Sequence, residues 1–273
     1  MSLYDAAAPS FDRHRALPDG VAPAIRTAVL ASIGEVRQPR LLDLGAGTGR
    51  IGWPFVAAGD DYIGVDLSLG MLRAFMGRAE CSGAPARLAQ ADGQRLPFPD
   101  ATFDAVLLIQ VFGGMPGWRL LVTEARRVLR RTGALIIGRT VAPADGIDAQ
   151  MKQHLAHLLE AMGVEADRRN VHDDVQHWLG AAARRVNSVI AASWKADRTP
   201  RGFLVRHRTG ARFAALPEPV KDEAMRRLGI WAGETFGSLD AVFSEQYAFE
   251  LHAFKFAEEG GLLKCPTRQK TPC

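Results

Sequence analysis

Cysteine is scarce in this chain, and its few cysteines lie far apart. The 273 residues contain three, Cys81, Cys265 and Cys273. An odd and scattered set excludes a disulfide-stapled fold and is typical of a reduced, cytoplasmic protein. A Cys265–Cys273 disulfide or metal pair stays open as an alternative, but no C-x-x-C spacing or histidine cluster supports it. We therefore predict no metal site.

Long hydrophobic runs are also missing. No stretch of 18 apolar residues is uninterrupted, and no apolar segment follows a basic start, so neither a membrane span nor an export signal is expected. The net charge of +4 is a mild excess that does not by itself predict a nucleic-acid partner. With 47% hydrophobic and 23% charged residues, the composition is that of a globular protein and excludes wholesale disorder.

Strand and helix patterns alternate through the first 140 residues, without internal repeats. After a helix at 22–33, strands are predicted at 40–44, 62–66, 86–91, 103–111 and 133–140, and helices at 48–58, 69–78 and 120–130. This alternation predicts a doubly wound parallel α/β sheet. Pro54 falls early in the 48–58 helix and is expected to bend it.

The rhythm changes after residue 141. Helices are predicted at 147–162, 173–183 and 217–236, a strand at 186–194, and an edge or antiparallel strand at 244–256, where polar and apolar residues alternate. The two strands are expected to complete a mostly parallel, seven-stranded sheet. We predict an N-terminal arm and helix (1–34), a core (35–145, 184–199 and 240–258), a helical cap over the carboxyl ends of the strands (146–183 and 200–239) and a disordered tail (259–273).

The segment LLDLGAGTGR, residues 41–50, has glycine at every second position from Gly45 to Gly49. Glycines between a buried strand and a helix let the backbone approach a nucleotide-type ligand. Asp66 ends the next predicted strand, about 20 residues on, where a carboxylate suits a ribose diol. The alternative is that Asp66 caps the following helix at Ser68.

Three features separate the two adenosine cofactors that use such a bend, NAD and S-adenosylmethionine. The loop reads G-x-G-x-G followed by Arg50, not G-x-G-x-x-G. Asp43, two residues before the first glycine, disfavours a pyrophosphate and suits an ammonium group. Asp92 ends the third strand, where it can reach an adenine amino group, while Ala91 and Gly93 leave room for the ring.

These residues carry a resemblance. LLDLGAGTGR, the acid in VDLS (65–68), ADGQRLPF (91–98), FDAVLLIQV (103–111) and LVTEARRVLRRTGALII (121–137) occur in the order and spacing of class I S-adenosylmethionine-dependent methyltransferases. The resemblance is strong over residues 38–140. The N-terminal Tyr4 and FDRHR, with the helical insertion before the last strand, resemble bacterial members of this group that act on small molecules.

The resemblance implies a Rossmann-like fold and a cofactor site for S-adenosylmethionine, with S-adenosylhomocysteine as product. Asp43 would lie near the methionine ammonium, Asp66 on the ribose, and Leu67 against the adenine. The other implied contacts are Gly45, Ala46 and Gly47 along the cofactor, Met71 nearby, Ala91, Asp92 and Gly93 at the adenine edge, and Gln110 and Val111 at the methionyl part.

The chain departs from this pattern where many relatives carry a histidine-rich or acidic stretch. It has QVFGGMPGW after the fourth strand, which removes an obvious base, and RTGA instead of Pro-Gly-Gly before the fifth. Methyl transfer needs a base only if the nucleophile must lose a proton. The candidate catalytic residues are Tyr4, His14, Gln110 and His154. The other reading makes His14 part of an exposed arm and His154, with His157, part of an exposed cap face.

Other residues have a functional and a structural reading. Phe112, Met115 and Trp118 either floor the acceptor pocket or belong to the core. The pairs Arg126-Arg127 and Arg130-Arg131 resemble a nucleic-acid stripe, but suit the solvated face of a helix better. We predict a cytoplasmic enzyme, monomeric or homodimeric, that methylates a small molecule and has no nucleic-acid or membrane partner. The alternatives are RNA or DNA methylation, a non-catalytic S-adenosylmethionine-binding protein, and an NAD-linked oxidoreductase.

Overall fold

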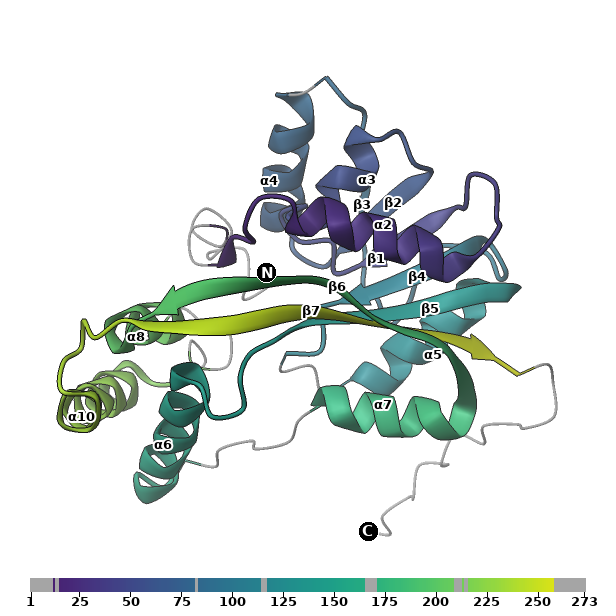
Figure 1. Ribbon diagram of the computed structural model, residues 1–273. Coiled ribbons are helices and arrows are strands. Elements are labelled where there is room, and N and C mark those ends of the chain that lie inside the picture. The colour runs from purple at the N-terminus through teal and green to yellow at the C-terminus, as the bar shows by residue number, and fades with distance from the viewer. Residues whose placement is uncertain are drawn as a thin grey trace, which may run out of the picture.

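The fold consists of one twisted sheet between two layers of helices, with three further helices at one end (Figure 1). The computed structural model describes Asp12 and residues 15–81, 83–113, 117–164, 171–208, 213 and 216–257. Tyr4, His14, Met115, Cys265, Cys273 and the predicted tail lie outside the described residues. No helix within these ranges is long and apolar enough to cross a membrane.

The sheet has seven strands in the order β3-β2-β1-β4-β5-β7-β6. They are β1 (Leu41–Leu44), β2 (Tyr62–Asp66), β3 (Arg87–Gln90), β4 (Phe103–Ile109), β5 (Leu129–Val141), β6 (Ala183–Arg198) and β7 (Phe243–Phe256). The first five are parallel, and β7 is antiparallel to both of its neighbours, β5 and β6. The predicted mostly parallel sheet is confirmed.

The alternating strand β7 is antiparallel, as predicted, but it is not an edge strand. It lies between β5 and β6, and residues 251–254 are buried because neighbours pair with it on both sides. The edge strand on this side of the sheet is β6, which is longer than the predicted 186–194. Strand β5 ends at Val141. Beyond that point β6 and β7 continue together as a two-stranded ribbon (Figure 1).

Helices cover both faces of the sheet. On one face lie α2 (Val21–Ile33), α3 (Trp53–Ala57) and α4 (Leu69–Glu80), whose apolar side chains share a core with Leu41, Leu107 and Phe249. On the other face lie α5 (Trp118–Val128) and α7 (Val171–Ala182), packed with Leu42, Val106 and Phe254. Figure 1 shows these two layers above and below the strands. Both faces of β4 are fully buried, as its continuous apolar sequence predicts.

Three helices, α6 (Ile147–Ala161), α8 (Pro200–Arg208) and α10 (Glu218–Phe236), lie beside the far end of the β6–β7 ribbon (Figure 1). They have a core of their own, built from Ile147, Met151, Leu155, Phe203, Phe213, Ala224, Met225, Leu228 and Ala232. We call these three helices the cap. The second half of the predicted cap segment 146–183 is not part of this cap, because Val175 and Leu179 of α7 pack on the sheet.

Several boundaries also differ from the sequence prediction. The helix after the glycine loop begins at Trp53, not at residue 48, because Gly49 has a φ of +77° that a helix cannot contain. Pro54 therefore occupies the first turn, where it needs no backbone donor, and it does not bend the helix. Helix α5 ends at Val128, since β5 already pairs with β4 at Leu129.

Candidate functional site

The glycine loop between β1 and α3 has a backbone that only glycine adopts readily. Gly45, Gly47 and Gly49 have φ values of +83°, +57° and +77°. A Cβ on Gly45 would lie 2.9 Å from Cγ2 of Val111, and one on Gly49 would lie 2.2 Å from the Phe75 ring. Around the Cβ position of Gly47, in contrast, the nearest atom is 3.9 Å away. The middle of the loop is therefore open on the side where a ligand would approach.

Asp66, at the end of β2, ties this loop to the neighbouring turn. Its Oδ2 accepts the Gly47 N–H at 2.9 Å, and its Oδ1 accepts the Ser68 N–H at 2.8 Å. Ser68 is itself the N-cap of α4, since its Oγ accepts the N–H of Met71. Each carboxylate oxygen can accept a second hydrogen bond. Asp66 can therefore hold the turn before α4 and also accept hydrogen bonds from a ribose, so its two predicted roles are compatible.

Asp43, in β1, is buried and paired with a tyrosine. The Tyr62 hydroxyl donates to Oδ2 of Asp43 at 2.6 Å. Burial raises the pKa of Asp43 to about 7, against the opposing effect of the Tyr62 hydrogen bond, and the nearby charge of Asp66 raises it further. An unpaired carboxylate is costly in such a place, so a cation beside it would favour its ionised form.

The carboxyl end of β3 carries Asp92 on an exposed turn. Its Oδ1 accepts the Gln94 N–H at 2.9 Å. Gly93 beside it packs closely on α5, because a Cβ there would lie 2.5 Å from the Leu121 side chain. Asp92 is thus held by its own turn, and its exposed carboxylate lies at the same edge of the sheet as Asp66.

Three further residues predicted at the adenine end differ in exposure. Leu67 is 58% exposed. Ala91 is half-buried, and its N–H donates to the Asp66 carbonyl at 3.2 Å. Met71 is buried in α4. Leu67 is therefore the apolar side chain of the three that is open to a planar ligand.

Gln110, directly after β4, links the glycine loop to β5. Its Nε2 donates to Oγ1 of Thr140 at 2.6 Å, and its Oε1 accepts a hydrogen bond from Arg50. Its backbone N–H donates to the Gly138 carbonyl at 2.8 Å, and its φ is +55°. A left-handed backbone is uncommon for glutamine, and such strain gathers at functional sites. The structure thus places this predicted residue at the end of β4, bonded to Arg50 after the glycine loop and to Thr140 near the end of β5.

The segment before α2 lies over the glycine loop. Asp12 accepts from the Thr48 hydroxyl at 2.6 Å and from Arg78 at 2.5 Å. Arg50 donates to the Arg15 carbonyl at 2.5 Å. Burial lowers the pKa of Arg50 to about 10; Asp12 opposes this effect, and the charges of Arg15 and Arg78 add to it. The loop is therefore held in a cation-rich environment.

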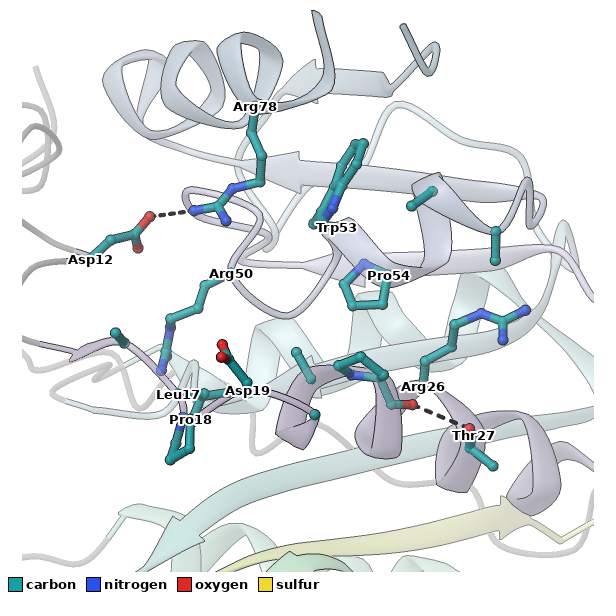
Figure 2. A pocket seen from close by; sticks show the side chains of 16 residues that line it. Asp12, Leu17, Pro18, Asp19, Arg26, Thr27, Arg50, Trp53, Pro54 and Arg78 are labelled. Carbon is teal, nitrogen blue, oxygen red and sulfur yellow. Dashed lines mark hydrogen bonds and ion pairs between the residues drawn. The ribbon is translucent and has the colours of Figure 1, made fainter. Parts of the chain in front are cut away.

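A cavity of about 790 Å³ opens between this segment and helices α2 and α3. Figure 2 shows Arg50, Arg78 and Asp12 along one side of it, Arg26 and Thr27 on α2, and Trp53 and Pro54 of α3. None of the residues predicted to contact the cofactor lines this cavity. It is lined by Arg50 and Trp53, which follow the glycine loop, and not by residues at the carboxyl ends of β1 and β2.

His154, the other catalytic candidate among the described residues, is not brought to the loop. His154 of α6 stacks on Trp231 of α10 with ring centroids 4.0 Å apart, so it packs within the cap. Burial, with the neighbouring His157, lowers its pKa. Phe112 and Trp118 are buried in the core beside α5 and α7, as their structural reading expected. Among the described residues, no group of three or more His, Cys, Asp or Glu side chains could hold a metal ion.

The predicted basic pairs serve the fold, and only Arg126-Arg127 lies on α5, whereas Arg130-Arg131 lies at the start of β5. Arg127 binds Glu124, Asp100 and the carbonyls of Leu96 and Phe98, and Arg130 pairs with Asp104 at 2.6 Å. Arg126 lies over the Phe256 ring, 5.1 Å from its centroid. These engagements leave little reason to assign the arginines to a nucleic-acid surface.

Tyr62, Thr140 and Asp12 were not among the sequence candidates. Tyr62 reaches Asp43 because β2 pairs with β1 in the register Leu41–Tyr62, which the sequence does not display. Thr140 comes into place through the pairing of β5 with β4. Asp12 belongs to the FDRHR segment, and that resemblance was the available signal for it.

Comparison with known proteins agrees with the fold. Residues 42–137 match a family described as a methyltransferase domain. The chain is 27% identical over 198 residues to the demethylmenaquinone methyltransferase of Renibacterium salmoninarum, covering 72% of this chain and 81% of that protein. It is 31% identical over 147 residues to the phosphatidylethanolamine N-methyltransferase of Cereibacter sphaeroides, covering 53% and 70%.

Among solved structures, the YcgJ protein of Bacillus subtilis superposes with a TM-score of 0.55. The alignment covers 86% of this chain and 99% of that chain at 21% identity. At this identity the likeness establishes the fold alone.

Proposed function

The chain belongs to the class I S-adenosylmethionine-dependent methyltransferases, and from that premise we propose that its glycine loop binds the cofactor and that its acceptor is a small molecule. The observation that carries the proposal is the juxtaposition of Asp43, Gly47 and Asp66. A buried acid, an open glycine and a second acid lie together at the carboxyl ends of adjacent strands. In open α/β sheets, ligands bind at this edge.

The residues present fit S-adenosylmethionine group by group. The open side of Gly47 allows close backbone approach. Asp66 has acceptor capacity for the ribose diol, and the exposed Leu67 and Asp92 suit the face and the amino edge of an adenine. Asp43 suits the ammonium group, since burial leaves its charge without a cationic partner among the contacts described above. A pyrophosphate would meet this acid unfavourably, so the NAD alternative is not favoured.

When bound, the cofactor supplies a methyl group already activated on a sulfonium sulfur. The protein's own task is then to orient the acceptor and to exclude water. Gln110, held between Arg50 and Thr140, fixes the position where β4 and β5 end. The cap, joined to the sheet by the β6–β7 ribbon, lies on the side where the acceptor would enter (Figure 1).

Two observations support a small-molecule acceptor. The relatives named above are called methyltransferases of demethylmenaquinone and of phosphatidylethanolamine, which are both small molecules. Two arginines of the predicted basic pairs are engaged within the fold: Arg127 of α5 by Glu124 and Asp100, and Arg130 of β5 by Asp104. A nucleic-acid methyltransferase is therefore not favoured, and family membership does not favour the non-catalytic alternative.

Calorimetric titration of the full chain with S-adenosylmethionine and S-adenosylhomocysteine tests the cofactor site. We expect both to bind, and Asp66→Ala to weaken binding at least about tenfold through the loss of charge-assisted hydrogen bonds. Asp61→Ala is the matched control, because Asp61 lies just before the opposite end of β2, paired with Arg87. If neither compound bound the unaltered chain, the proposal would be wrong.

A further inference from the structure

The cavity between α2, α3 and the segment before α2 is not used by the proposed function. Its volume of about 790 Å³ lies within the range of small-molecule pockets, roughly 300–1,000 Å³. None of the residues proposed to contact the cofactor lines it. Its walls come from several separate parts of the chain (Figure 2), so the cavity is a product of the tertiary fold. The question is which ligand these walls suit.

Apolar side chains form much of the cavity wall. Trp53 and Pro54 of α3 line one part of it, and Leu17 and Pro18 of the segment before α2 line another (Figure 2). Pro18 is exposed and the other three are half-buried, so each of them has surface that a ligand can reach. Covering this surface favours a ligand with an apolar body, and the rings of tryptophan and proline suit a flat one.

Arg50 also lines the cavity, and its side chain extends toward Leu17 and Pro18 (Figure 2). It donates to the Arg15 carbonyl at 2.5 Å and to Oε1 of Gln110, which are both neutral acceptors. No carboxylate of the described residues forms an ion pair with this guanidinium. A guanidinium has five N–H donors, so these two hydrogen bonds leave donors for a ligand.

The other charged side chains that line the cavity are paired or exposed. Arg26 is held by a carboxylate through two hydrogen bonds, at 2.6 and 2.8 Å. Arg78 forms a 2.5 Å ion pair with Asp12. Asp19 is exposed, so water and salt screen its charge. The cation that can take an anionic ligand here is therefore Arg50.

The electrostatic surroundings of Arg50 favour an anion beside it. Burial is the main cause that lowers its pKa to about 10, and an anion would offset this cost of burying the charge. The N-terminal end of α2 adds to the preference. Gly20, its N-cap, provides no side-chain cap, and both Gly20 and Ala22 line the cavity. The backbone N–H groups of a helix N-terminus carry partial positive charge.

We propose that this cavity is a second ligand site, which binds a small organic carboxylate with a flat apolar body. The carboxylate lies on the guanidinium of Arg50, and the apolar body packs against Trp53, Pro54 and Leu17. A cationic ligand of the same shape is rejected, because it would meet a like charge at Arg50. The inference goes beyond the proposed function and does not depend on it, since the cavity and the cofactor site share no residue.

The test is calorimetric titration of the full chain with three naphthalene probes of one shape. 2-Naphthoate is the anion, 2-naphthamide is neutral, and 2-naphthylmethylamine is cationic. We expect the carboxylate to bind at least about tenfold more tightly than the amide, and the amine to bind most weakly. Equal affinity for carboxylate and amide, or no binding of the carboxylate, would overturn the inference.

A second titration separates this site from the cofactor site. The carboxylate should bind with retained affinity when the chain is saturated with S-adenosylhomocysteine. Displacement of 2-naphthoate by S-adenosylhomocysteine would overturn the inference, because the cavity would then belong to the cofactor site. A chain that binds 2-naphthoate as expected but does not bind S-adenosylhomocysteine would contradict the proposed function and support the second site.

Two variants locate the binding. Thr27→Trp fills the cavity from the exposed side of α2 and should weaken the carboxylate and the amide at least about tenfold. Thr123→Trp is its control, because Thr123 is an exposed residue of α5 whose hydroxyl makes the same bond to a carbonyl four residues earlier. Arg50→Met should lower the affinity for the carboxylate to that for the amide and leave the amide unchanged.

The exposed Arg73 of α4, which does not line the cavity, provides the control for the lost charge, and Arg73→Met should change neither affinity. Binding of the amide to the Arg50→Met chain shows that this variant is folded. Carboxylate binding that survives both Thr27→Trp and Arg50→Met would place the probe elsewhere and overturn the inference.

Discussion

The Tyr62 hydroxyl donates a 2.6 Å hydrogen bond to the carboxylate of Asp43, two residues before the glycine loop begins. Burial holds the pKa of Asp43 near 7, well above its ordinary value of 3.8, and raises that of Tyr62 as well. Asp43 therefore changes its protonation near neutral pH, where a small change of environment alters its charge.

This shift predicts how stability depends on pH. A carboxyl group whose pKa is raised on folding stabilises the protein below its unfolded pKa, and that contribution is lost as pH rises through the folded pKa. The free energy of unfolding should thus fall between pH 4 and 8, by an amount on the order of 2–4 kcal/mol. Asp43→Asn should flatten this dependence, as measured by urea unfolding at several pH values. An unchanged slope in the variant would contradict the assignment.

The same acid predicts a proton release on cofactor binding. A cation placed beside Asp43 favours its ionised form, so affinity for S-adenosylmethionine should increase as pH rises through about 7 and then level off. Calorimetry in buffers of different ionisation enthalpy counts the protons released, and we expect up to one near pH 6. Asp43→Asn should release none. Proton uptake by the unaltered chain would exclude this role for Asp43.

A third prediction concerns the close packing of the loop. Gly49→Ala should destabilise the protein by about 3 kcal/mol or more, because the new methyl group meets the buried Phe75 and the backbone is left-handed. Gly59→Ala is the matched control, since Gly59 has nearly the same φ, +76°, and open space around its Cβ position. It should cost only about 1–2 kcal/mol. Equal losses in urea unfolding would show that packing on Phe75 does not hold the loop.

A fourth prediction separates the strain at Gln110 from its function. Gln110→Gly relieves the left-handed backbone, so this variant should be about 1 kcal/mol more stable than Gln110→Ala. Both lose the bridge between Arg50 and Thr140, and we expect both to reduce the rate of methyl transfer about tenfold. Unfolding curves and single-turnover rates measure the two effects. A Gln110→Gly enzyme of unchanged rate would show that the bridge has no catalytic role.

The parts of the fold that could be predicted from the sequence are those with local patterns. Three such patterns each depend on a single strand and agree with the structure. They are the continuous apolar run of β4, the glycines after β1 and the acid that ends β2. The short α3 shows the limit of such patterns, because the periodicity of residues 48–58 does not reveal the left-handed Gly49.

The parts that could not be predicted depend on contacts between distant segments. The pairing of Asp43 with Tyr62 follows from the register of two strands. Helix α7 is buried on the sheet, but its helical pattern alone would suit a helix of the cap equally well.

The most direct measurement of the central claim is a crystal structure of the full chain with S-adenosylhomocysteine. The account predicts the ribose hydroxyls on the carboxylate of Asp66, the homocysteine ammonium on the side of Asp43, and the adenine against Leu67. It would be contradicted by a ligand seated instead in the cavity between α2, α3 and the N-terminal segment, without contact to Asp66.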